Sequence, residues 1–498
     1  MPINRRSFLK GSLAAGAALS LPGLVIGDPL DRPTAHPSTR PALVPKADAM
    51  VLIYLPGGIA QHDMWDCKQH TPFRAGMKGS ELLGTCPIID TSADTIKLGA
   101  GLENLAQVMH HATVLRTLSS DTKFGAIHLK AQYYLMTGYL FPAGFKAPSI
   151  GAVVSRTLGR RDPNVPPYIY IGWDIDTSDN ERLFISEYLG PGFYGVNHQP
   201  FMIPNAAEGL ATLHAQAGME TSRLDRRQRL LARVAAMQDP SLKDSPKAAE
   251  YLRTMNDARA MMDSPVKKAF DFAKEESRET IAAYQPQITA RELRDGSYYY
   301  GDRFGSGLLL ARRLLESGAR FIQVELQYGP FKGWDQHEYG SSRMVEMKKQ
   351  IDRPLARFIK DLDERGMLGR TLVVVMTEFG RTIASAPAAG VEPDGFAERH
   401  TGEDLVIADE KLYGFHGHFS STSCMVMFGG GFKQGYVHGK TAERHPMTAV
   451  ENPVQLTDAH ATIYKAMGIS ADTSYVTESR PVYVTKDGKG VAVDEMLA

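Results

Sequence analysis

Several features that would place this chain in a common class are missing. Its 498 residues include only three cysteines, Cys67, Cys86 and Cys424, and these follow no metal-binding spacing. Basic and acidic residues number 56 each, so no net charge attracts the protein to nucleic acid or to an anionic membrane. No segment has the uninterrupted apolar run of about 20 residues that a membrane span needs. We therefore expect neither a nucleic-acid partner nor a stable membrane span.

The N-terminus has the pattern of an export signal. Residues 4–10 read Asn-Arg-Arg-Ser-Phe-Leu-Lys, which matches the twin-arginine motif, and a short apolar run rich in Ala, Leu and Gly follows. We predict a twin-arginine signal peptide at residues 1–27, a proline-rich linker at 28–47, and a periplasmic or secreted protein handled by the twin-arginine translocase. Cys67 and Cys86 could pair in that oxidising compartment, but the sequence does not decide it.

The remainder, residues 48–498, alternates between strand and helix patterns. Residues 50–55, 321–326 and 371–376 are apolar runs typical of strands buried on both faces. A helix with apolar residues on one face, from Met344 to Leu362, separates the last two. Such a strand–helix–strand order predicts neighbouring parallel strands joined by a right-handed crossover. The expected fold is α/β, a doubly wound, mainly parallel sheet sandwiched by helices.

Residues 209–284 depart from this rhythm. Charged residues are dense there, strand patterns vanish, and apolar residues recur at helical spacing, as at Leu224, Leu230, Leu231 and Val234. We predict a helical insertion. It either caps a site at the strand ends or is a solvated excursion without such a role.

Polar residues follow two of the predicted strands. Gly333-Trp-Asp-Gln-His337 comes after strand 321–326, and Thr377-Glu-Phe-Gly-Arg381 comes directly after strand 371–376. Ligands of open α/β sheets bind beyond the carboxyl ends of the strands. We therefore expect these two loops to share one site.

The residue types in these loops suit a metal ion and an anion. Asp335 and His337 lie two residues apart, and His418 and Glu378 could supply a third and a fourth ligand. Carboxylate with imidazole favours zinc, with manganese or calcium as alternatives. Glu378 could instead be a general base. Arg381 could clamp an anionic oxygen, or form a salt bridge with a nearby carboxylate. His128, on a helix with apolar neighbours, is also interpretable as an interior histidine.

These two loops resemble a family of twin-arginine-exported bacterial proteins of unknown function, placed within the alkaline phosphatase/sulfatase-like superfamily. Matching stretches continue in order to the C-terminus, and they include Pro56-Gly57-Gly58 with His62, Asp63 and Asp66, His128 with Thr137-Gly138, Gly429-Gly-Gly431, and Asp458 with His460. The resemblance implies a doubly wound α/β sandwich and hydrolysis of phosphate or sulfate esters, usually with metals. Residues Asp335, His337 and His418 match one ion's ligands in the two-metal members.

The chain also departs from the superfamily pattern. Its first strand ends in Gly57-Gly58 where an aspartate is usual, and Glu378-Phe379 stands where Asp-His is usual. His62 and Asp63 could substitute from the first loop. No Cys-x-Pro-x-Arg sulfatase signature occurs, so a formylglycine mechanism is not expected. Thr122 is a candidate nucleophile, although hydroxyls before a helix also serve as caps.

Two functions follow from these patterns. The first is an exported metal-dependent hydrolase of phosphate or sulfate esters, acting on an anionic small molecule or a polysaccharide ester. The alternative is a degenerate, non-catalytic relative that serves as a binding or assembly protein outside the cytoplasm. The absent first-strand aspartate motivates the alternative.

Overall fold

The computed structural model describes residues 35–36, 42–119, 127–141, 143–172, 187–209, 226, 257, 259–293, 299–326, 333–383 and 405–498. At its centre is a nine-stranded sheet in the order β15-β6-β14-β10-β2-β9-β7-β8, with β18 beside β6. The strands are β2 (Ala49–Tyr54), β6 (Ala112–Ser119), β7 (Tyr168–Ile171), β8 (Phe201–Ile203), β9 (Phe321–Glu325), β10 (Thr371–Met376), β14 (Ser423–Phe428), β15 (Tyr436–His438) and β18 (Val454–Gln455).

The sheet is mainly parallel, as the sequence predicted. Strand β14 is antiparallel to both of its neighbours, β10 and β6, and the other pairings in the sheet are parallel. The predicted adjacency of β9 and β10 is wrong, because β2 lies between them and pairs with both. Every residue of β2 is buried, so this central place covers both of its apolar faces. The carboxyl ends of β9, β2 and β10 still meet at one edge.

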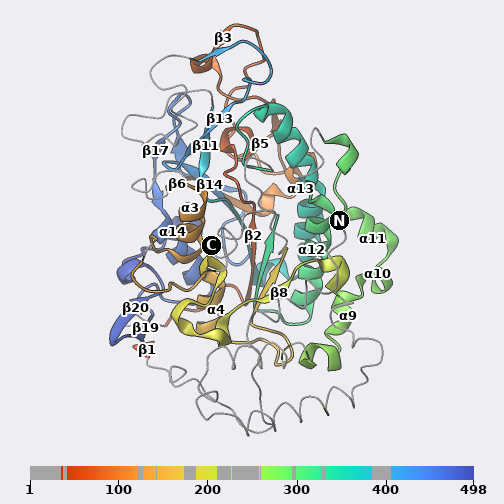
Figure 1. Ribbon diagram of the computed structural model, residues 1–498, viewed down its shortest axis with the longest axis vertical. Coiled ribbons are helices and arrows are strands. Elements are labelled where there is room, and N and C mark those ends of the chain that lie inside the picture. The colour runs from red at the N-terminus through yellow and green to blue at the C-terminus, as the bar shows by residue number, and fades with distance from the viewer. Residues whose placement is uncertain are drawn as a thin grey trace.

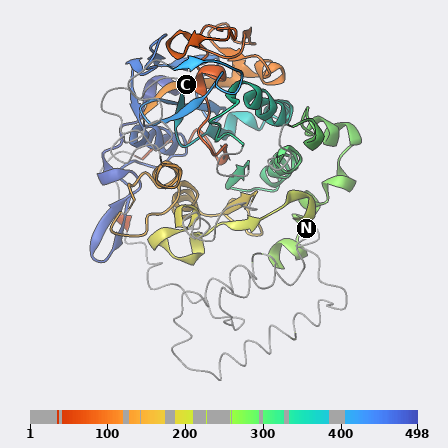
Figure 2. The same cartoon turned by 45° about the horizontal axis from the view of Figure 1, so that its top comes forward.

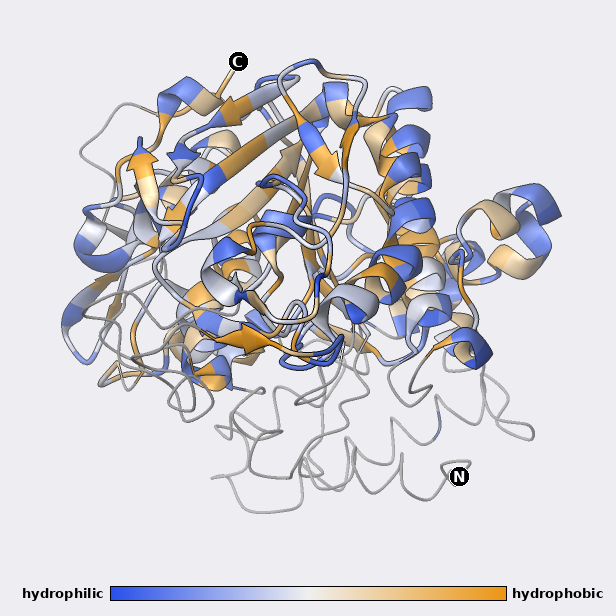
Figure 3. Cartoon of the chain, turned by 90° about the horizontal axis from the view of Figure 1, so that it is seen from above, coloured by the Kyte–Doolittle hydropathy of each residue, from blue (hydrophilic) through white to orange (hydrophobic). Residues whose placement is uncertain are grey.

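Helices cover both faces of the sheet (Figure 1). Val51 and Ile53 of β2 pack in the core beneath α12 (Gly301–Glu316) and α13 (Gly340–Glu364). Met50, Leu52 and Tyr54 pack in a second core with α3 (His128–Thr137), α4 (Ile150–Leu158) and α14 (Leu456–Ala466). Alternate residues of a strand face opposite sides, so one apolar strand supplies both cores. In Figure 3 the hydrophobic strands lie between helices whose outer sides are hydrophilic.

Smaller elements surround the sheet. Four two-stranded sheets pair β11 (Gly380–Ile383) with β13 (His416–Phe419), β3 (Met77–Lys78) with β12 (Val406–Ile407), β4 (Ile88–Asp90) with β5 (Lys97–Gly99), and β16 (Lys440–Thr441) with β17 (Ala449–Glu451). A three-stranded sheet joins β1 (Ala35–His36), β19 (Ser474–Thr477) and β20 (Arg480–Tyr483). Short helices include η2 (Gln61–Asp63) and α2 (Glu103–Ala106). The predicted linker therefore contributes β1, although residues 1–34 and 37–41 lie outside the described part.

The described part of the predicted insertion is helical. Helices α9 (Lys267–Phe270), α10 (Phe272–Glu275) and α11 (Arg278–Ala283) lie on the outer side of α12 and α13 (Figure 1 and Figure 2). Arg313 of α12 donates to the carbonyl oxygens of Ala269 and Lys268, which fixes this attachment. Residues 210–225 and 227–256 lie outside the described part, so capping of the site by the insertion stays a prediction.

Two further expectations concern thiols and membranes. All three cysteines lie in described residues and are free thiols; Cys67 donates to the carbonyl oxygen of Met64, and Cys86 to that of Asp63. The helices in the described ranges include none that is both long and apolar enough to cross a membrane.

Candidate functional site

Three loops and the two-stranded sheet of β11 and β13 meet at the carboxyl edge of the central sheet. Strand β2 runs into Pro56-Gly57-Gly58, the loop after β9 carries Asp335 and His337, and β10 runs through Glu378 into β11. Strand β13 pairs antiparallel with β11 and places His418 opposite Arg381. Side chains far apart in the sequence therefore come together at this edge.

The Asp335 carboxylate is the centre of the site. Its Oδ1 lies 2.7 Å from the Arg381 guanidinium, and both side chains are buried. Three imidazoles approach the same oxygen with their Nε2 atoms, at 3.1 Å for His128, 3.2 Å for His337 and 3.3 Å for His418. The structure thus brings together Asp335, His337 and His418, as the sequence predicted, and it adds His128.

His128, Asp335 and His418 form a group suited to a metal ion. Each offers one ligand atom, and these atoms all lie within 4.8 Å of one another. The Nε2 atoms of His128 and His418 are 3.1 Å apart. Two imidazoles and a carboxylate are a common ligand set for a catalytic zinc ion, which keeps a further position open. His337 lies beside this group, on the shared Asp335 oxygen.

Glu378 lies behind His128 and is not a member of that group. Its Oε1 is 2.7 Å from His128 Nδ1, the ring nitrogen that does not contact Asp335. The carboxylate also accepts hydrogen bonds from the Gly57 N–H at 2.9 Å and the Tyr54 hydroxyl at 3.1 Å. A carboxylate on the far nitrogen of a ligand histidine fixes the tautomer and the orientation of the ring. The sequence predicted that Glu378 could itself be a metal ligand, whereas in the structure Glu378 contacts a candidate ligand, His128.

Opposite charges set the protonation of these groups. Burial alone lowers the pKa of His128, but the carboxylates of Asp335 and Glu378 outweigh it and raise this pKa to about 9. Burial raises the pKa of each carboxyl, yet the facing His128 holds the pKa of Asp335 well below, and that of Glu378 below, the usual value. Burial lowers the pKa of His337 to about 4, so its imidazole is neutral at pH 7.

All three nitrogens of the Arg381 guanidinium donate hydrogen bonds to oxygen atoms of the protein itself. Nε donates to the Gly58 carbonyl at 2.8 Å, Nη1 donates to the Gln336 carbonyl at 3.1 Å, and Nη2 donates to the Gly57 carbonyl and to Asp335. Of the two roles predicted for Arg381, the structure shows the salt bridge with a nearby carboxylate. The guanidinium joins the first loop to the loop of Asp335.

Glycine is required where the first loop passes the site. Gly57 has a φ of +123°, and a Cβ there would lie 2.4 Å from the Asp335 backbone nitrogen. Gly58 has a φ of +75°, and its Cβ would meet the Phe379 ring at 2.4 Å. Side chains rarely adopt these backbone conformations. A side chain at either position would therefore collide with the loop of Asp335 or with Phe379.

A protonated carboxyl lies below the site. Burial raises the pKa of Glu325, the last residue of β9, to about 8, and the nearby charge of Glu378 adds to this effect. Tyr170 donates to Glu325 Oε2 at 2.6 Å. The folded protein therefore keeps a proton that the unfolded chain loses above about pH 4.5.

Glu325 should thus make stability depend on pH. The contribution of Glu325 to the free energy of unfolding is expected to fall as the pH rises from about 4.5 to about 8 and to level off above that. Glu325→Gln should remove about 2–5 kcal/mol of this fall. Urea unfolding at pH 5 and pH 8.5 measures it, with the exposed Glu451→Gln as control. Equal pH dependence in wild type and Glu325→Gln would contradict the prediction.

Three further candidates from the sequence are Thr122, His128 and the pair of His62 and Asp63. Thr122 lies outside the described residues, so its role as nucleophile stays a prediction. The sequence left open whether His128 is an interior histidine. Its sequence signals are the family resemblance, which includes His128, and its place at the start of a helix after a hydroxyl-rich loop. His62 and Asp63, the suggested substitutes, lie in a second group with His416.

Comparisons with known proteins agree with the resemblance seen in the sequence. The model of the family described as "Protein of unknown function (DUF1501)" matches residues 47–497, and the model of the twin-arginine translocation pathway signal sequence matches residues 2–22. No curated protein matches the chain.

Three solved structures illustrate a distant likeness. A protein in the alkaline phosphatase superfamily from Vibrio parahaemolyticus is 10% identical, with 100% of this chain and 81% of that chain covered and a TM-score of 0.40. The PsFucS1 sulfatase from Pseudoalteromonas sp. is 10% identical, with 91% and 76% covered and a TM-score of 0.35. Alkaline phosphatase from the Antarctic bacterium TAB5 is 11% identical, with 78% and 92% covered and a TM-score of 0.32.

The family match spans nearly the whole chain, and the signal match lies at its N-terminus. The signal indicates export by the twin-arginine translocase to the periplasm or beyond. The chain therefore belongs to the DUF1501 family of proteins of unknown function and carries a twin-arginine signal sequence.

Proposed function

We propose that this exported protein is a metal-dependent hydrolase of phosphate or sulfate esters. The ion would be held by His128, Asp335 and His418, with His337 beside them. The observation that supports this proposal is the convergence of three imidazole Nε2 atoms on one buried carboxylate oxygen, all within 3.3 Å. It lies at the sheet edge where ligands of α/β proteins bind.

The donor set fits a zinc-class ion. Imidazole nitrogen with carboxylate oxygen suits zinc, and also manganese, better than calcium, which prefers an all-oxygen site. The His128 and His418 nitrogens face each other at 3.1 Å, and one divalent cation would bind both once the Nε2 proton of His128 is released. When bound, such an ion polarises an ester oxygen and lowers the pKa of a coordinated water.

The protein's own residues would orient this centre. Glu378 holds the Nδ1 proton of His128, which leaves Nε2 directed at Asp335. Arg381 fixes the Asp335 carboxylate and balances its charge. We assign Arg381 a positioning role and leave Thr122 as the proposed nucleophile. The substrate class would be an anionic small molecule or a polysaccharide ester.

Metal content and turnover test the proposal together. The purified exported protein is analysed for metals, then assayed on aryl phosphates and aryl sulfates before and after loading with zinc or manganese. His128→Gln should lose this ion and lower kcat/KM by roughly 100-fold or more, as outer and direct ligand changes do. His460→Gln is the control for replacing an interior histidine, because His460 is 1% exposed, its Nε2 bonds to the Leu135 carbonyl at 2.9 Å, and it is not part of the His128–Asp335–His418 group.

A metal-free protein that stays inert after loading would reject the hydrolase. One observation favours the non-catalytic alternative, namely that the Arg381 guanidinium is engaged by the protein and not directed at a substrate anion. If His128→Gln leaves metal content unchanged and every ester remains uncleaved, a binding or assembly role becomes the better assignment.

A further inference from the structure

A second group of histidines and a carboxylate lies outside the site described above. His62 and Asp63 belong to the short helix η2, and His416 is the first residue of β13. All three are at most 1% exposed. Buried ionisable groups in a cluster are costly without partners, so this arrangement needs an explanation.

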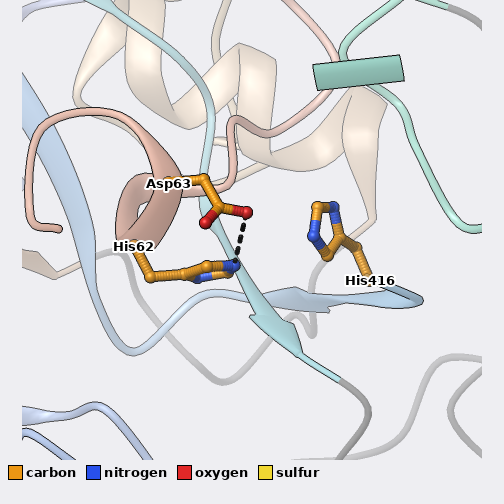
Figure 4. Close-up of side chains that lie close together, drawn as sticks. All are labelled: His62, Asp63 and His416. Carbon is orange, nitrogen blue, oxygen red and sulfur yellow. Dashed lines mark ion pairs between the residues drawn. The ribbon is translucent and has the colours of Figure 1, made fainter. Parts of the chain in front are cut away.

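The three side chains face a common space. Figure 4 shows the His416 ring directed toward the His62 ring and the Asp63 carboxylate, which approach from the other side. One ligand atom from each lies within 4.8 Å of the others, and His62 Nε2 is 3.7 Å from Asp63 Oδ2. Three such atoms lie within about 2.8 Å of a common centre, so each would move inward by less than about 1 Å to reach zinc-bond length.

The imidazoles lack other protein partners. Among the described residues, neither ring nitrogen of His62 nor of His416 has a hydrogen-bond partner. Each buried unsatisfied polar atom costs about 1–3 kcal/mol. The two rings meet edge to face at 5.4 Å, but such a contact contributes only about 0.5–1.5 kcal/mol. Ring packing therefore does not offset the cost, whereas a bound ion would satisfy one nitrogen of each ring.

The carboxylate is already oriented for such a role. Thr85 donates to Asp63 twice, from its backbone N–H to Oδ1 at 2.7 Å and from its hydroxyl to Oδ2 at 2.6 Å. Each oxygen keeps a further lone pair. Hydrogen-bonded carboxylates are typical of metal ligands, because the outer partner fixes their direction.

The scaffold holds the two halves of this group in register. Gln61, next to His62, exchanges two hydrogen bonds with the backbone of Arg381, at 2.8 and 3.1 Å. Arg381 lies on β11, which pairs with β13. A Cβ on Gly380 would lie 2.5 Å from Gln61 Oε1, so glycine is needed for this contact. The arrangement is therefore built by specific contacts between η2, β11 and β13.

We propose that His62, Asp63 and His416 bind a second divalent ion of the zinc class. Two imidazoles and one carboxylate give three protein ligands and leave a position open. The ion would join η2 to β13, the strand that also carries His418. This assignment goes beyond the hydrolase proposal and does not depend on it, since it concerns a different set of ligands.

Metal stoichiometry of the full exported chain tests the proposal. After zinc loading and removal of free zinc, wild type is expected to carry two ions per chain and His416→Gln one. His128→Gln should keep one ion, and the double variant should keep none. His460→Gln is the control for replacing a buried histidine, and it should carry two. Loss of cooperative unfolding would identify a variant that fails to fold.

A measurement on the wild-type protein tests the second site even where a variant fails to fold. Anomalous scattering at the zinc edge from wild-type crystals should show a peak between the two imidazoles and Asp63. Absence of this peak, or a His416→Gln protein with the same ion count as wild type, overturns the second site. One ion per chain that His128→Gln keeps and His416→Gln loses would support the second site while rejecting the hydrolase centre.

Discussion

Replacing Asp335 with asparagine is expected to lower the free energy of unfolding of the metal-free protein by about 3–5 kcal/mol. The carboxylate balances the fully buried Arg381 and accepts from it at 2.7 Å. Asparagine has nearly the same shape but no charge, so the guanidinium would be left buried without its counter-ion. Urea unfolding of chelator-treated wild type and Asp335→Asn measures the difference.

A surface aspartate provides the control for this substitution. Asp363 lies 3.5 Å from His111, and its side chain is 52% exposed. Asp363→Asn should change the free energy of unfolding by less than about 1 kcal/mol, as is usual for exposed pairs. If the two variants lose equal stability, the Asp335–Arg381 pair does not have the role described here. Zinc content should also fall by one ion in Asp335→Asn alone.

Replacing Arg381 with lysine should have the second large effect. Lysine has a single ammonium group and cannot reach the carbonyl oxygens of Gly57, Gly58 and Gln336 together with Asp335. We expect a loss of about 3–4 kcal/mol, because buried acceptors are left without donors. Thermal and urea unfolding measure it. Arg370→Lys is the matched control, since Arg370 makes a bidentate pair with Asp48 but is half exposed.

The same pair of variants separates the two roles considered for Arg381. A positioning role predicts lower stability and a lower kcat, with KM for an anionic ester little changed. If Arg381→Lys keeps wild-type stability while KM rises at least tenfold, the guanidinium contacts the substrate and the positioning role is wrong. Arg370→Lys should leave kcat and KM unchanged.

Much of the fold could be predicted because apolar runs report burial directly. Residues 371–376 were expected as a strand and form β10 with the same bounds, and every residue of it is buried. The long helix before it was expected from its apolar face and forms α13. The order of strands could not be predicted, because local pattern does not say which strand occupies the space between β9 and β10. Strand β2, more than 260 residues before β9, occupies it.

Some residues of the candidate site could likewise be predicted from the sequence, and others could not. Asp335, His337 and His418 could be predicted because their types and loop positions are visible in the sequence. The sequence left Glu378 open between metal ligand and general base and left the role of His128 undecided, since these roles depend on which atom of each residue faces the centre. Glu378 contacts His128 through Nδ1, and only the three-dimensional arrangement shows this. His416 differs from His418 by two positions on one strand, yet it lies with His62 and Asp63.

The ligands of each candidate metal group come from distant parts of the sequence, and this determines when the protein becomes able to bind metal. His62 lies beside His416 in space, although most of the chain separates them in sequence. His128 lies beside His418 across a sequence separation that is nearly as long. Neither ligand set exists until β13 has packed against the segments that precede it, which are η2 for His416 and α3 with the loop after β9 for His418. Because the twin-arginine pathway transports chains that are already folded, both ligand sets would be assembled in the cytoplasm and ready to bind an ion before export.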